Sequence, residues 1–241
     1  MSKNIKPFSK LSELEAFDPK IFEGDQGAPQ EVCNFVLALS CVYNDYKDIL
    51  MAFHYLDYLQ PQFPVKETPE WGEFNGLKFH LIRIHISLVH ELLSLIERSK
   101  GILSDPYFQS ITNHLDKLGK RTWEALVKAA DGKASTSLGR TFLMIRNKVA
   151  FHYDPKEFFK GYRNWFLNGN KVKKPYISRG GKITEERYYF AEASAQSYFD
   201  NLCSDGSINA KQVLNLATSL GPAISQIVKS FIDERRRTKK Q

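Results

Sequence analysis

The sequence of 241 residues contains only three cysteines, and this scarcity excludes several classes of protein. Cys33, Cys41 and Cys203 lack the C-x-x-C spacing of a zinc ribbon, and an odd number this small is too few for a disulfide framework. Free thiols suit a reducing compartment, so we expect a cytoplasmic protein.

Long apolar runs are also missing. No stretch reaches about 18 uninterrupted apolar residues, so we expect no membrane span, and the amino end lacks the pattern of a signal peptide. With 42% apolar and 25% charged residues, the composition excludes a disordered chain, a collagen-like fibre and a coiled-coil rod. A chain of this length can bury a full core.

Apolar residues recur at three- and four-residue steps over most of the chain, which is the period of an amphipathic helix. This pattern predicts long helices from Glu31 to the turn at 60–64 and from Glu70 to Ser99. Further helices are predicted at 104–130, 137–153, 154–166, 191–202 and 207–235. Gly221-Pro222 is expected to kink or split the last of these.

One stretch alone is typical of β structure. Residues 175–178 and 183–190 flank Arg179-Gly180-Gly181-Lys182, whose composition favours a hairpin turn. The predicted fold is therefore a mostly α, antiparallel helical bundle with a small β-hairpin insertion near residues 175–190. We expect an irregular arm over 1–30 and one helical domain over 31–241. Its parts are a core at about 31–166, a basic hairpin at 167–190 and C-terminal helices at 191–235.

The positive charge is concentrated in one segment. Between Arg146 and Arg187 there are eleven Lys and Arg against four Asp and Glu, which accounts for the whole net charge of +7. A neutral body with one basic segment favours a polyanionic partner, most simply nucleic acid. The alternative is a solvated loop that keeps the protein soluble.

The most informative stretch begins at the first arginine of this segment. Arg146 is followed directly by Asn147 and, six positions after Arg146, by His152, near the predicted end of a bundle helix. In an ideal α-helix Arg146 and His152 lie about 120° apart, so they would converge only if the helix loosens or if a dimer completes the site.

This pattern resembles the R-x(4–6)-H signature of the HEPN family of helical nucleases and nucleotide-binding modules. The resemblance implies a homodimeric helical bundle that cleaves RNA without a metal or cofactor. Arg146 would stabilise charge on the scissile phosphate, His152 would act as general acid or base, and Asn147 would orient a phosphate oxygen or the histidine. Attack by the ribose 2′-hydroxyl would leave a cyclic phosphate. A toxin or defence effector with an antitoxin or other regulatory protein is then expected.

Six cations of the basic segment are predicted to contact the RNA: Lys148, Lys171, Lys173, Lys174, Arg179 and Lys182. The aromatic residues at 158–166 could stack bases or form core or dimer interface. The main alternative function is a non-catalytic helical module that binds RNA, a nucleotide or a partner protein through the same surface. A purely structural assembly protein is a third possibility.

Other histidines and arginines have simpler interpretations. His152 could be a core histidine paired with a backbone carbonyl, and Arg146 could form a surface ion pair. Arg83 and His90 also satisfy the family spacing, but an isoleucine follows Arg83, and we interpret this pair as structural. His80, His85 and His90 recur every five residues and would wind around a helix rather than meet at a metal, so no metal site is predicted.

Overall fold

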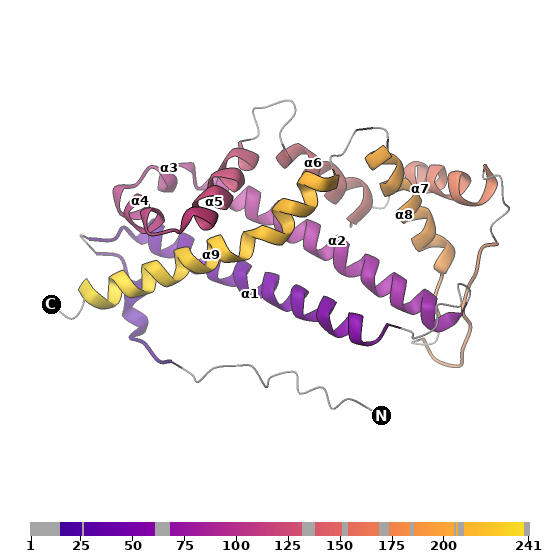
Figure 1. Ribbon diagram of the computed structural model, residues 1–241, viewed down its shortest axis with the longest axis horizontal. Coiled ribbons are helices and arrows are strands. Elements are labelled where there is room, and N and C mark those ends of the chain that lie inside the picture. Colours follow the sequence, from indigo (N-terminus) through magenta and orange to yellow (C-terminus); the bar gives the residue numbers. More distant parts are fainter. Residues whose placement is uncertain are drawn as a thin grey trace.

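The structure is a computed structural model that describes residues 15–25, 27–60, 68–131, 138–150, 154–168, 174–183, 186–204, 206 and 210–238. Helices form the body of this part of the chain (Figure 1), which confirms the prediction of a mostly α-helical bundle. The elements are η1 (Pro19–Phe22), α1 (Gln30–Tyr58), α2 (Pro69–Arg98), α3 (Lys100–Leu103), α4 (Pro106–Asn113), α5 (Lys117–Ala130), α6 (Leu138–Ile145), η2 (Arg146–Ala150), α7 (Pro155–Tyr162), η3 (Arg163–Leu167), α8 (Tyr189–Ser204) and α9 (Ala210–Thr238).

Three long helices, α1, α2 and α9, carry the core of the bundle. α1 and α2 run antiparallel, and α9 packs along α1 and α5 (Figure 1). Leu39 of α1, Leu92 of α2 and Ile224 of α9 are completely buried. Burial of the apolar face of each helix is the main favourable term in folding, which explains why the helical period is so clear in the sequence.

α2 is the one described helix that is long and apolar enough to cross a membrane by length and composition. In this structure 44% of its most apolar window is buried inside the protein. It packs against α1, α5 and α6. The arrangement is compatible with a soluble protein.

Two helix starts that the sequence predicts are confirmed. Asp105 accepts a hydrogen bond from the backbone N–H of Tyr107 at 2.8 Å, and Asp154 accepts one from that of Lys156 at 3.0 Å. In both helices a proline occupies the first turn, where its missing N–H costs nothing. The Asp154 cap therefore begins α7 directly after the motif.

The prediction of a single helix over 104–130 is wrong. It is divided into α4 and α5, because the carboxylate of Asp116 caps a new helix by accepting from the backbone N–H of Gly119 at 2.7 Å. An aspartate at this position satisfies a donor that no helical carbonyl can reach. The local hydrogen bond therefore outweighs continuation of the first helix.

The β-hairpin predicted near residues 175–190 does not form strands in the described residues. One antiparallel bridge joins Ser178 to Arg187, with the Ser178 N–H donating to the Arg187 carbonyl at 2.9 Å. Beyond Arg187 the two segments share one more backbone hydrogen bond, from the N–H of Phe190 to the carbonyl of Tyr176 at 3.4 Å, and helix α8 begins at Tyr189. The last two residues of the predicted second strand, 189 and 190, are therefore the start of a helix.

α9 does not split at Gly221-Pro222, although the proline lies inside the helix. Pro222 has no N–H, so the carbonyl of Thr218, four residues earlier, loses its helical partner. The hydroxyl of Tyr46 donates to that carbonyl at 2.7 Å. Gly221 makes the approach possible, because a Cβ there would lie 2.3 Å from Cε1 of Tyr46.

A second side chain supports the same turn of α9. Nε2 of the buried His85 lies 2.9 Å from the carbonyl oxygen of Ala217. Because a carbonyl can only accept, Nε2 carries the proton and donates. Burial lowers the pKa of His85 below its usual value of 6.5, and the bond to Ala217 partly opposes this effect. His85 is thus a neutral core histidine.

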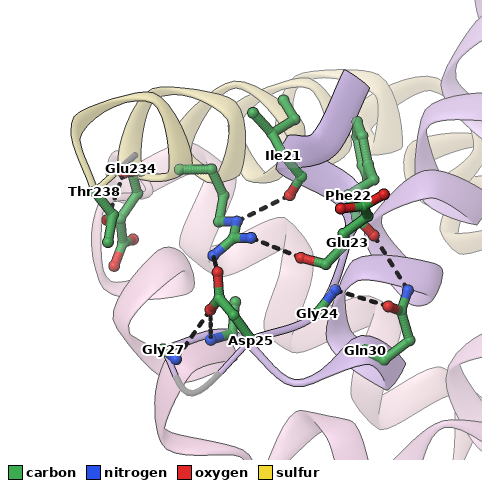
Figure 2. Close-up of polar contacts among 11 residues, drawn as sticks. Ile21, Phe22, Glu23, Gly24, Asp25, Gly27, Gln30, Glu234 and Thr238 are labelled. Carbon is green, nitrogen blue, oxygen red and sulfur yellow. Dashed lines mark hydrogen bonds and ion pairs between the residues drawn. The ribbon is translucent and has the colours of Figure 1, made fainter. Parts of the chain in front are cut away.

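The described part of the amino-terminal arm is attached to the carboxyl-terminal half of α9 by Arg235, whose side chain is only 1% exposed. Its guanidinium donates to the carbonyls of Ile21 at 2.9 Å and Glu23 at 2.7 Å and to the carboxylate of Asp25 at 2.8 Å. Figure 2 shows these three acceptors turned toward the same point. Residues 21–25 therefore belong to the packed body of the protein.

Candidate functional site

Arg146 and Asn147 begin η2, a π-helical turn that continues α6. Phe142 and Ile145 are completely buried and hold α6 in the core, so the chain reaches the surface at the next residues. Arg146 is half-buried and Asn147 is exposed. Nη1 of Arg146 donates to Oδ1 of Asn147 at 3.1 Å. The structure therefore brings together two of the three residues of the predicted motif.

The third motif residue, His152, lies outside the described residues, as do Lys171 and Lys173. The three cations Lys174, Arg179 and Lys182 lie within 174–183 and are exposed to solvent. Their roles in RNA binding stay predictions.

Lys148, the remaining predicted RNA contact, lies near the start of α7. The pKa of Glu157 is lowered chiefly by its 3.0 Å hydrogen bond from Lys160, and the charge of Lys148 adds to this effect. The negative charge of Glu157 on α7 therefore offsets part of the positive charge beside Arg146 and Asn147.

Arg187, the last cation of the basic segment, is held in ion pairs. Its Nη1 pairs with Glu73 of α2, and its Nη2 and Nε bind the two carboxylate oxygens of Glu192 at 2.6 and 3.1 Å. A guanidinium bound in this two-point manner is fixed in orientation as well as position. Arg187 thus attaches the end of the basic segment to the bundle and is not one of the exposed cations.

Two glycines of α2 provide the surface on which this attachment lies. A Cβ at Gly76 would be 2.1 Å from Nη2 of Arg187, and one at Gly72 would be 2.4 Å from Cε1 of Tyr189. The glycines are four residues apart and hence on one face of the helix. Sequence reasoning missed this contact, although two glycines at that spacing inside a long apolar helix were a signal for close approach.

The aromatic residues at 158–166 divide between the core and the surface. Phe166 is buried, whereas Phe159 is 56% exposed. The ring of Phe159 lies nearly parallel to that of Tyr162, with centroids 6.4 Å apart. Part of this group is therefore core, and Phe159 is exposed to solvent.

A pocket that sequence reasoning missed lies between α2, α5 and α6, with a volume of about 170 Å³. Its polar lining comes from α2 and α6: His90, Ser94, Glu97 and Arg140. Its apolar lining comes from all three helices: Leu93, Ala129, Ala130 and Leu143. α6 forms one wall of this pocket and leads directly into η2. The same stretch of helix therefore supplies pocket residues and the Arg146–Asn147 pair.

His90 lines the pocket with only part of its imidazole ring. Its Nδ1 is buried and forms no hydrogen bond with any described residue, although a carboxylate oxygen of Glu91 lies 3.4 Å away. Arg83, which the sequence pattern pairs with His90, instead lies over the ring of Phe79 at 5.9 Å. The arginine that shares the pocket with His90 is Arg140, from another helix. Sequence spacing could not indicate that neighbour.

Within the described ranges, no three His, Cys, Asp or Glu side chains are grouped so that they could hold a metal ion. Of the histidine series on α2, His85 is buried against Ala217 and His80 is exposed.

No family model, no curated protein and no solved structure matches this chain. Its functional interpretation therefore rests on the motif, the helical architecture and the two sites described above.

Proposed function

We propose that the protein is a HEPN-like, metal-independent endoribonuclease in which Arg146, Asn147 and His152 act on the scissile phosphate. The observation that carries the proposal is the hydrogen bond from Arg146 to Asn147 on η2. It places a permanently charged guanidinium beside an amide at the end of a bundle helix. A π-helical turn inside a helix occurs frequently at functional sites.

The proposed chemistry is transfer of a phosphoryl group within the RNA chain. The ribose 2′-oxygen loses its proton to a base and attacks phosphorus, while the bond from phosphorus to the 5′-oxygen breaks and that oxygen receives a proton. His152 supplies or removes a proton, for which a pKa near neutrality is suitable. Arg146 stabilises the negative charge that develops on the phosphate oxygens. The products are a 2′,3′-cyclic phosphate and a 5′-hydroxyl.

RNA is proposed to lie along the cations Lys148, Lys171, Lys173, Lys174, Arg179 and Lys182. Support comes from the exposure of the described members at 174–183 and from Arg187, which attaches the end of that segment to α2. We further propose a cytoplasmic homodimer that works as a toxin or defence effector. An antitoxin or other regulatory protein would restrain it, because unrestrained RNA cleavage would harm the cell.

The decisive experiment is cleavage of a labelled RNA in EDTA by the wild type, Arg146→Ala and His152→Ala. Each substitution is expected to lower the rate at least about 100-fold, since positioned acid–base and charge-stabilising groups each contribute about that much or more. Arg121→Ala, which removes an exposed arginine on α5, is the matched control and should cleave normally. Unchanged cleavage by both motif variants, or no cleavage by the wild type, would refute the proposal.

The second candidate is a non-catalytic module that binds RNA through the same basic surface. The observation in its favour is that the ion pairs of Arg187 with Glu73 and Glu192 hold the end of the basic segment on the bundle. The exposed cations at 174–183 take no part in these ion pairs. It predicts RNA binding that survives His152→Ala and weakens when Lys171, Lys173 and Lys174 are changed to Gln. The salt dependence of binding should become shallower in that triple variant, because fewer counterions are released.

A further inference from the structure

The pocket between α2, α5 and α6 presents opposite charges from two helices. Glu97 of α2 and Arg140 of α6 both line it and are both exposed to solvent. Leu143 and Ala129 contribute apolar surface. A ligand that fits this pocket needs hydrogen-bond donors for Glu97, hydrogen-bond acceptors for Arg140 and an apolar surface against Leu143 and Ala129.

The volume limits the size of that ligand. About 170 Å³ corresponds to roughly six water molecules in the liquid. Pockets for drug-sized ligands measure about 300–1,000 Å³. The pocket therefore accepts one ring system or one small group of a larger molecule, with the rest of that molecule outside.

The charges exclude a simple anion site and favour a nucleobase. A phosphate would be repelled by Glu97, whereas a base is neutral and has separate donor and acceptor edges. Guanine offers two adjacent donors, N1–H and the N2 amino group, to a carboxylate, and two acceptors, O6 and N7, to a guanidinium. Adenine, cytosine and uracil lack the pair of adjacent donors that a carboxylate can bind at two points.

The position of the pocket relative to the motif suits an RNA chain. Leu143 precedes Arg146 by three residues, so the wall of the pocket and the motif lie within about one helical turn of each other. Successive nucleotides of a strand are separated by at least about 3.4 Å. The base in the pocket would thus belong to a nucleotide next to, or one removed from, the phosphate at Arg146.

We propose that this pocket binds a guanine base of the RNA through Glu97 and Arg140, and that it selects which phosphate reaches Arg146. The selection of a phosphate rests on the proposed ribonuclease function, whereas binding of the base does not. Arg140 carries five N–H donors, so it can bind two base acceptors while keeping a contact within the protein.

The test measures binding to His152→Ala protein, so that cleavage cannot interfere. The probes are fluorescently labelled RNA hexamers of uridine with guanosine, inosine or adenosine at the fourth position, followed by fluorescence anisotropy. The guanosine hexamer is expected to bind about tenfold more tightly than the adenosine hexamer, which is typical discrimination for one two-point contact. Inosine lacks the N2 amino group and should bind with intermediate affinity. This comparison needs no change in the pocket.

Pocket variants then assign the preference to residues. Glu97→Gln and Arg140→Met, each combined with His152→Ala, should reduce the guanosine preference below about twofold while leaving affinity for hexauridine unchanged. Glu124→Gln, which changes an exposed carboxylate on α5, is the matched control and should keep the preference. Thermal unfolding of each variant confirms that the fold is retained.

The outcomes separate this inference from the ribonuclease proposal. If the wild type cleaves RNA but the hexamers bind equally, the pocket assignment is wrong and the ribonuclease proposal stands. If guanosine is preferred but no RNA is cleaved, the pocket stands and the ribonuclease proposal fails. A preference that persists in both pocket variants, or that inorganic phosphate abolishes as effectively as GMP, would also overturn the pocket assignment.

Discussion

The hydroxyl of Tyr46 on α1 donates a 2.7 Å hydrogen bond to the backbone carbonyl of Thr218 on α9. That carbonyl is the one that Pro222 deprives of its helical donor. Tyr46, which precedes Thr218 by 172 residues, thus supplies the donor that α9 lacks at this carbonyl. The bond also connects two of the three long helices.

Tyr46→Phe is expected to destabilise the protein by about 1–3 kcal/mol, because a buried carbonyl is left without a donor while the ring is kept. Chemical denaturation monitored by circular dichroism measures the free energy of unfolding. Tyr58→Phe, which removes an exposed hydroxyl from the same helix, is the control and should have little effect. Equal stability of the wild type and Tyr46→Phe would show that the bond is not needed to support α9.

His85 should make stability depend on pH. Burial lowers its pKa below 6.5 in the folded state, so the unfolded chain binds the proton more readily. Stability should therefore fall as pH decreases below about 6.5, until the folded pKa is reached. His85→Gln keeps a donor for Ala217 but does not titrate, so the difference in unfolding free energy between the two proteins should shrink toward acidic pH. A constant difference between pH 5 and 8 would contradict this role.

Arg235→Met should be among the most destabilising single substitutions. It leaves the carbonyls of Ile21 and Glu23 and the carboxylate of Asp25 without their common donor, and a buried acceptor left without a donor costs about 1–3 kcal/mol. Limited proteolysis should then cut near residues 21–25 first. Arg237→Met changes an exposed arginine on the same helix and should leave both melting temperature and proteolysis unchanged.

Gly76→Ala tests the attachment of the basic segment to α2. The added methyl would overlap the Arg187 guanidinium, which is the end of a long side chain, so we expect the Glu73–Arg187–Glu192 contacts to weaken and the protein to lose about 1 kcal/mol of stability or less. Gly101→Ala is the matched control, because a Cβ at that position meets nothing within 4 Å. A melting temperature of Gly76→Ala equal to that of Gly101→Ala would show that α2 and Arg187 adjust without cost.

Much of the helical framework could be predicted from the sequence, since the periodicity of α1 and α2 and the caps at Asp105 and Asp154 are local signals. The hairpin could not, because its turn residues are local but its second strand competes with the start of α8 at Tyr189. The position of Arg146 and Asn147 near the end of a bundle helix was likewise predictable. Their hydrogen bond and the π-helical turn depend on how η2 packs against α2 and α8.

The sequence by itself determined a helical protein whose excess charge begins at Arg146, because helical period, capping and net charge are properties of neighbouring residues. Only the tertiary structure decided that Arg187 is held in ion pairs with Glu73 and Glu192. It also decided that Pro222 lies inside an unbroken helix and that Arg140 lines the same pocket as His90. Each of these depends on groups far apart in the chain, and the free energy of a buried or paired polar group is fixed by the partner that the fold brings to it.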